Sequence, residues 1–111
     1  MKSLADLPSL VAGIHQRLYA SSSLFSFGSG QDFANSESMI AFADAGGLGL
    51  PDRDYYTKTD SKSEEIRMRY VAHMAQLFGL IGESPEAAAR DAAAVMRFET
   101  ALAKASLTRV E

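Results

Sequence analysis

The stretch Leu80-Ile81-Gly82-Glu83-Ser84-Pro85-Glu86 decides the arrangement of the C-terminal half of the chain, because it combines a helix stop with a helix start. Gly82 is placed to close a helix in the left-handed conformation, which costs glycine little. Ser84 is a favourable N-cap, Pro85 suits the first helical position, and Glu86 lies near the positive end of the helix dipole. Because the connection is so short, the two helices are predicted to form an antiparallel hairpin.

The helix before this connection is predicted to begin near Asp60 or Ser61, where Ser61 and Glu64 have the spacing of a capping box. Its apolar residues recur at helical spacing and form one stripe: Ile66, Tyr70, Met74, Leu77 and Ile81. The helix after the connection has its own expected buried stripe: Ala88, Ala92, Val95, Phe98, Leu102 and Ala105. We expect the two stripes to pack against each other.

A further helix is predicted near the N-terminus, with Asp6 as its N-cap and Pro8 in its first turn, where a missing N–H costs nothing. Apolar residues again recur at helical spacing: Leu7, Val11, Ile14 and Leu18. The run Ser21-Ser22-Ser23 is expected to end this helix.

The segment that follows has the pattern of a small β-hairpin. Phe25 and Phe27 alternate with small residues at a period of two, and residues 39–43 form a second short strand candidate. Asn35 and Ser36, which favour turns, lie between the two. The sequence therefore predicts a mainly helical fold with three principal helices, the last two an antiparallel hairpin, and a β-hairpin between helices one and two.

Length and composition limit the function classes. A chain of 111 residues has room for one small domain, so residues 1–111 are expected to form a single unit. The hydrophobic share of 47% argues against a disordered chain, and no apolar run is long enough to span a membrane. The formal charge of −3 removes the electrostatic reason to expect nucleic-acid binding. Without cysteine there is no disulfide or thiolate site.

Histidines and glycines give weak signals for chemistry. His15 and His73 lie in separate predicted helices, and neither has a second histidine four residues away, as a zinc-peptidase helix requires. Glycine-rich residues 46–49 lack the lysine of a phosphate-binding loop, and residues 28–30 lack the spacing of a nucleophile elbow. We expect two partly buried or exposed histidines, and glycines that serve tight connections.

Carboxylates offer one stronger candidate. Asp52 and Asp54, in a helical turn expected to begin at Pro51, and Glu64 with Glu65, at a helix start, suit the positive ends of helices.

Glu99 is different, because it follows Val95 by one helical turn on the side expected to face inward. A structural hydrogen bond or ion pair, with Arg53 as one candidate partner, is favoured over catalysis for Glu99. Tyr55 and Tyr56 are expected to act as a structural clamp, with at least one ring buried.

Three motifs carry a resemblance to a known family. Residues 48–56, Leu48-Gly49-Leu50-Pro51-Asp52-Arg53-Asp54-Tyr55-Tyr56, resemble the signature LGLP-x-RDYY of neprilysin-like zinc metalloendopeptidases. Upstream, a strand-turn-strand pattern of that family is matched by Phe27, Asp32, Asn35, Ser36 and Ile40. Downstream, residues 98–106 are similar to its helix motif E-x-x-LA-x-AS. The three motifs cover most of the chain in the family's order.

The resemblance implies a fragment of the mainly helical, non-catalytic region, which caps the catalytic domain and encloses a peptide-binding cavity. The family's zinc ligands belong to HExxH and ExxxD motifs that this chain lacks, so we expect no catalytic, cofactor-binding or metal residues here. Zinc belongs to the implied parent enzyme, as do the partners: its catalytic domain and its peptide substrates. Vertebrate members are rich in disulfides, so the lack of cysteine favours a bacterial source.

The leading hypothesis is that the chain is a fragment of a bacterial zinc metalloendopeptidase and contributes to the lid over its peptide-binding cavity. The alternative is a self-contained helical interaction module without enzymatic activity. Alanine-rich residues 87–94 also predict self-association through the helical region. The compartment stays open between the periplasm, or another extracytoplasmic location, and the cytoplasm.

Overall fold

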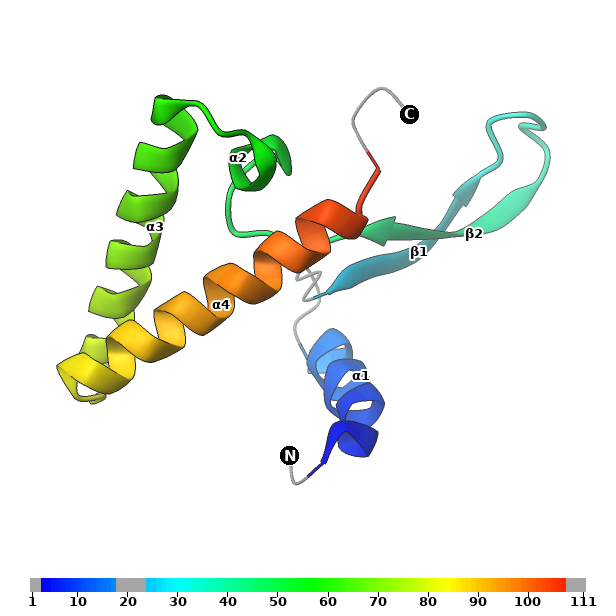
Figure 1. Cartoon of the computed structure of the whole chain (residues 1–111). Helices are drawn as coiled ribbons and strands as arrows, with labels where there is room; N and C mark the ends of the chain where they lie inside the picture. The colour runs from blue at the N-terminus through cyan, green and yellow to red at the C-terminus, as the bar shows by residue number, and fades with distance from the viewer. Residues whose placement is uncertain (1–2, 18–23, 108–111) are drawn as a thin grey trace. The chain divides into compact units, whose positions relative to one another are not determined.

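The structure, a computed structural model, describes residues 3–17 and 24–107. Contacts divide the chain into two compact units, residues 1–47 and 48–111. Helices dominate the described residues, and a two-stranded antiparallel hairpin accompanies them (Figure 1). The predicted mainly helical fold with a small β-hairpin is confirmed.

The first unit begins with a 3-10 turn, η1 (Leu4–Asp6), that leads directly into α1 (Leu7–Arg17). The prediction that Asp6 is the N-cap of this helix is wrong, because Asp6 belongs to η1. Its carboxylate instead accepts the backbone N–H of Ser3, at 3.0 Å. Val11 is the buried residue of α1. The predicted positions Leu18 and Ser21–Ser23 lie outside the described residues.

The hairpin of the first unit pairs β1 (Phe25–Gln31) with β2 (Met39–Ala45) in antiparallel register, with Phe25 opposite Ala45 and Gln31 opposite Met39. The predicted turn residue Asn35 organises the connection, because its backbone carbonyl accepts the N–H of Ser38 at 3.0 Å. The second strand extends two residues beyond the predicted 39–43.

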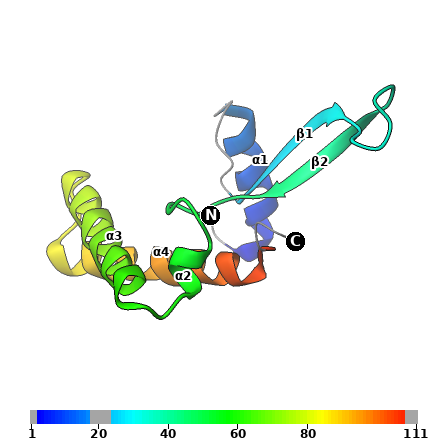
Figure 2. The same cartoon turned by 90° about the horizontal axis from the view of Figure 1, so that it is seen from above.

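The described residues of the second unit, 48–107, form three helices: α2 (Asp54–Thr57), α3 (Ser61–Leu80) and α4 (Pro85–Ala105). Helices α3 and α4 form the predicted hairpin, and α2 contacts both of them. Figure 1 shows the two long helices meeting at their connection and diverging from it, and Figure 2 shows α2 beside both from a second direction.

The connection at the tip of this hairpin forms as its sequence predicts. Gly82 has a φ of 100°, in the left-handed region that favours glycine. Its N–H bonds to the carbonyl of Gly79 and that of Glu83 bonds to Phe78, which is the hydrogen-bond pattern of a Schellman cap. The Ser84 hydroxyl accepts the N–H of Ala87 at 3.2 Å and caps α4.

The start of α3 differs from one prediction. Asp60 is the N-cap, and its carboxylate accepts both the N–H and the hydroxyl of Ser63, at 3.0 and 2.6 Å. Ser61 is consequently the first helical residue, and the capping box proposed for Ser61 and Glu64 does not form in this position. The side-chain oxygens of an aspartate are well suited to the role, so the competition between two good caps is resolved in favour of Asp60.

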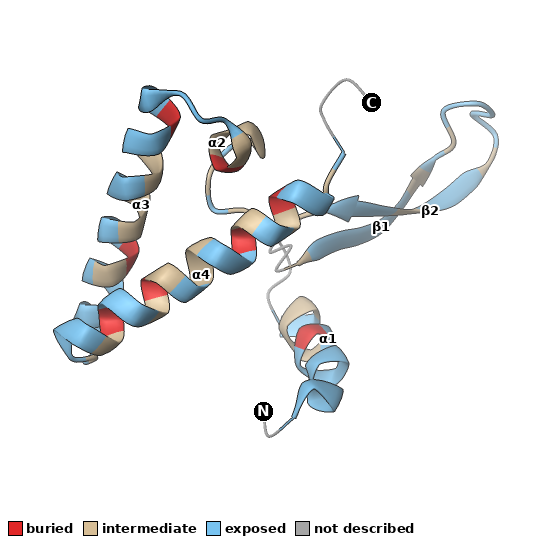
Figure 3. Cartoon of the chain, viewed as in Figure 1, coloured by how far each residue is buried: buried red, intermediate tan, exposed pale blue. Residues whose placement is uncertain are grey.

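The buried stripes of the hairpin are narrower than predicted (Figure 3). Of the apolar residues expected to be buried on α3, Met74 is buried, whereas Leu77 and Ile81 are exposed. On α4 the buried residues are Ala88, Ala92, Glu99 and Ala103. Ala88 and Ala92 are buried as predicted, whereas Phe98 is 52% exposed, so only towards the C-terminal end of α4 is the buried face shifted by about one residue, to Glu99 and Ala103.

Small side chains explain this packing, because alanines let two helix backbones approach closely along one line. None of the helices in residues 3–17 and 24–107 has the length and apolar character needed to cross a membrane.

Candidate functional site

The most constrained polar group in the second unit is the carboxylate of Glu99, on α4. Its side chain is only 7% exposed. One carboxylate oxygen, Oε2, accepts the hydroxyl of Tyr56 at 2.5 Å and the backbone N–H of Gly49 at 3.2 Å. The other, Oε1, accepts the hydroxyl of Tyr70 at 3.0 Å. Three donors from a loop, α2 and α3 therefore converge on one residue of α4.

The loop that carries the tyrosine signature is held closely against this carboxylate. The N–H of Leu50 donates to the Tyr56 hydroxyl at 2.8 Å, so Tyr56 both accepts from the loop and donates to Glu99. Its ring is 5% exposed, which confirms that at least one signature tyrosine is buried. A Cβ on Gly49 would lie 1.8 Å from the hydroxyl oxygen of Tyr70, so only glycine allows this approach.

The electrostatics keep both tyrosines protonated. Burial, followed by the hydrogen bond to the Glu99 carboxylate, raises the pKa of Tyr70 to about 12. The same two causes raise the pKa of Tyr56 well above the usual tyrosine range. An ionised phenolate beside a buried carboxylate is unfavourable, so the hydroxyls act as donors at neutral pH. This arrangement satisfies Glu99 and fixes its position, and it supports a structural role over acid–base chemistry.

Arg53, one candidate partner for Glu99, makes other contacts. Its Nε donates to the backbone carbonyl of Ala103 at 2.9 Å, and its guanidinium lies 3.9 Å from the Asp54 carboxylate. Arg53 thus ties the signature segment to α4 near the C-terminal end of that helix. The prediction of a structural hydrogen bond for Glu99 is confirmed, with tyrosines rather than arginine as the donors.

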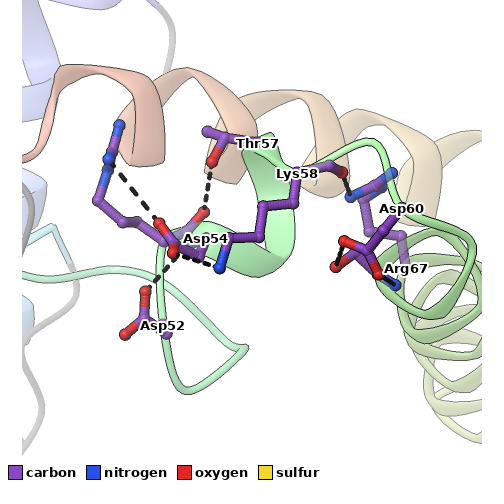
Figure 4. Close-up of polar contacts among 8 residues, drawn as sticks. Asp52, Asp54, Thr57, Lys58, Asp60 and Arg67 are labelled. Atoms are coloured by element: carbon purple, nitrogen blue, oxygen red, sulfur yellow. Dashed lines mark hydrogen bonds and ion pairs between the residues drawn. The ribbon is translucent and has the colours of Figure 1, made fainter.

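The remaining carboxylates of the segment stabilise its turns, as Figure 4 shows for Asp52, Asp54 and Asp60. Asp52 accepts the N–H of Asp54 at 2.9 Å, so the regular helical turn begins at Asp54 rather than at Pro51. Lys58 bonds to Asp54 at 2.9 Å, and that hydrogen bond lowers the pKa of the Asp54 carboxyl.

Further polar contacts hold the connection between α2 and α3 and the first turns of α3. Hydrogen bonds from Ser63 lower the pKa of the Asp60 carboxyl. The Arg67 guanidinium donates to the carbonyls of Tyr55 and Lys58, at 2.7 and 2.8 Å. Glu65, predicted to serve a helix start, pairs with Arg69 at 2.6 Å. All of these groups contribute to local structure.

The two histidines considered for metal binding belong to different units, His15 to the first and His73 to the second. His15 is half-buried, with its ring edge-on to Phe25 at a centroid distance of 5.0 Å, and His73 is exposed on α3. Within residues 3–17 and 24–107, histidine, aspartate and glutamate side chains form no group of three or more that could hold a metal ion. These residues therefore do not fit a zinc site.

The glycine-rich stretches also have structural roles. Residues 28–30 lie within β1, so Ser29 is part of a regular strand and not of the strand-to-helix turn that a nucleophile elbow requires. In residues 46–49, Gly47 adopts a φ of 78°. Tight backbone geometry accounts for these glycines without a bound phosphate.

Comparison with known proteins agrees with this scaffold. The family model described as "Peptidase family M13" matches residues 1–111. The chain is 38% identical over 90 residues to endothelin-converting enzyme 1 of Homo sapiens, covering 80% of this chain and 12% of that protein. It is 33% identical over 89 residues to an endothelin-converting enzyme homolog of Locusta migratoria, with the same coverage. Neprilysin-3 of Drosophila melanogaster is 30% identical over 84 residues, covering 76% of this chain and 11% of that protein.

The second unit is thus a helical unit that is organised around Glu99 and carries the neprilysin-like tyrosine signature. Its described residues form no cluster of metal ligands. The chain belongs to peptidase family M13, the neprilysin-like metallopeptidases. It spans 12% of the length of the endothelin-converting enzymes it matches.

Proposed function

We propose that this chain is a non-catalytic part of a zinc-dependent metalloendopeptidase and contributes to the lid over that enzyme's peptide-binding cavity. The observation that supports this most strongly is the match of the whole chain to the family. Its partners would be the remainder of the parent polypeptide, including the catalytic domain, and the peptides that this domain cleaves. The zinc ligands would belong to that domain.

The Glu99 network supports a scaffold role in two ways. All three of its contacts are made to groups of the chain itself, so the most buried carboxylate is already occupied by structural donors. The network also joins the signature loop, α2 and α3 to α4. A lid that admits peptides and excludes folded proteins has to keep a defined shape, and a buried, fully bonded network favours one conformation.

A bacterial source is part of the proposal. The chain contains no cysteine. The relatives named above are animal proteins and leave the source open. A bacterial source is supported only by the lack of cysteine, because the family resemblance implies that vertebrate members are rich in disulfides.

The sequence of the reading frame downstream of Glu111 tests the parentage. We expect an HExxH motif followed by ExxxD. A stop codon directly after Glu111 would contradict the proposal and favour the self-contained interaction module.

The lid role is tested in the full-length parent with Glu99→Leu. Loosening the lid is expected to raise cleavage of a large unfolded protein relative to a short fluorogenic peptide. Glu86→Gln, an exposed acid on the same helix, is the matched control. The lid role would be contradicted if the ratio of protein cleavage to peptide cleavage were unchanged in a Glu99→Leu enzyme whose Gly49 N–H has lost its protection from hydrogen exchange.

A further inference from the structure

A groove of about 740 Å³ lies between the diverging arms of the helical hairpin, and of the Glu99 network only Tyr56 contributes to its lining among the described residues. Its walls are mostly small or flexible apolar side chains: Met68, Val71, Ala72, Ala75, Ala89 and Met96. Alanines on both walls leave room for the backbone of a third helix to approach closely. Met68 is 67% exposed, and methionine adapts its shape readily to a partner.

The charged residues that line this groove all have the same sign. Lys58, Arg67 and Lys104 contribute to the lining, and no aspartate or glutamate does so among the residues that the structure describes. Lys58 forms an ion pair with Asp54, which offsets part of its charge. Arg67 donates to two backbone carbonyls, and because these are neutral, the positive charge of Arg67 is not offset by them. Figure 4 shows Lys58 and Arg67 where α2 leads into α3. Lys104 adds a further positive charge near the C-terminal end of α4.

We propose that this groove receives an amphipathic helix with an apolar face flanked by carboxylates, supplied by the rest of the parent polypeptide. The apolar walls call for an apolar face, and the cationic lining calls for negative charges beside it. The chain covers 12% of the length of its relatives, so most of a family member's polypeptide lies outside this chain. The inference that the helix comes from the parent polypeptide rests on the proposed function. The inference that it has an apolar face flanked by carboxylates rests on the lining of the groove alone.

Two probe helices test the chemistry on the intact 111-residue chain. One is an 18-residue helical peptide with a leucine and alanine face flanked by glutamates, and its twin has lysine in place of every glutamate. NMR titration should shift the methyl signals of Val71, Ala72 and Met96 with the glutamate probe. The lysine twin should bind at least about tenfold more weakly.

Variants of the chain separate charge from packing. Lys104→Glu should weaken the glutamate probe severalfold and strengthen its lysine twin, whereas Lys62→Glu, an exposed lysine of α3 outside the groove lining, should change neither. Ala72→Gln places a polar side chain on the groove wall at an exposed position, so the fold is retained while binding is reduced.

Several outcomes would overturn the inference: equal binding of the two probes, no effect of Lys104→Glu, shifts centred on Leu77 and Phe98, or a dimer in sedimentation experiments that Ala72→Gln abolishes. Failure of the probes alongside a downstream HExxH motif would refute the groove assignment alone. Binding of the glutamate probe alongside a stop codon after Glu111 would refute the parentage alone.

Discussion

Replacing Glu99 tests whether one buried carboxylate holds the second unit together. Its side chain is 7% exposed and accepts from Gly49, Tyr56 and Tyr70. Each hydrogen bond to a charged group contributes about 1.5–3 kcal/mol. Because the three bonds share one acceptor, their contributions do not add. Glu99→Leu should therefore lower the free energy of unfolding by about 3–5 kcal/mol, since three buried donors lose their acceptor.

Glu99→Gln separates charge from shape. The amide keeps one acceptor oxygen, and a tyrosine hydroxyl can rotate to accept from the new NH2 group. The expected loss is about 1–2 kcal/mol, smaller than for leucine. Glu86→Gln, at an exposed position in the first turn of α4, is the control and should change stability by no more than about 1 kcal/mol.

Urea unfolding followed by tyrosine fluorescence measures these differences, because the chain contains no tryptophan. Amide hydrogen exchange supplies a local readout: the Gly49 N–H should be protected in the wild type and lose its protection in Glu99→Leu. Equal stability of Glu99→Leu and Glu86→Gln, with Gly49 still protected, would refute the reasoning.

Four further expectations follow from the same contacts. Tyr56→Ala should cost about 3–5 kcal/mol in urea unfolding, as for other buried aromatics, and a loss below about 1 kcal/mol would contradict its burial. Gly49→Ala should destabilise the second unit in the wild type and cost less in a Tyr70→Ala background, where the hydroxyl it would meet is absent, and an equal cost in both backgrounds would contradict this. Between about pH 10 and pH 12 stability should fall by up to about 1.4 kcal/mol per pH unit for each of Tyr56 and Tyr70. The unfolded tyrosines ionise first while the folded ones stay protonated, so the effect is absent below pH 10 and Tyr70→Phe weakens it. Sedimentation at rising concentration should reveal self-association through the helical region, where Leu77 and Phe98 are 48% and 52% exposed, and a persistent monomer would contradict this.

Local signals in the sequence were sufficient for the helical hairpin. Gly82 and Ser84 act on backbone groups within a few residues of themselves, so neighbouring residue types determine the stop and the start. The β-hairpin was predictable for the same reason, because its alternating strands and turn residues are close in sequence.

The network around Glu99 could be predicted only in part. Helical position alone marked Glu99 as inward-facing, but its hydroxyl donors lie 43 and 29 residues away, beyond any local pattern. Burial of Ala88 and Ala92 on α4 was predicted correctly, but Phe98 was wrongly expected to be buried because hydrophobicity favours it. Ala103, which lies one helical turn after Glu99, was the signal that could have corrected this.

Peptide cleavage by the purified 111-residue chain tests directly whether this chain is non-catalytic. Catalytic zinc requires about three protein ligands and a nearby carboxylate to take a proton. The described residues hold no such group, and their most buried carboxylate is engaged by Tyr56, Tyr70 and Gly49. With a fluorogenic peptide and added zinc, the account predicts no cleavage above background. Cleavage that zinc supports and a chelator abolishes would contradict it.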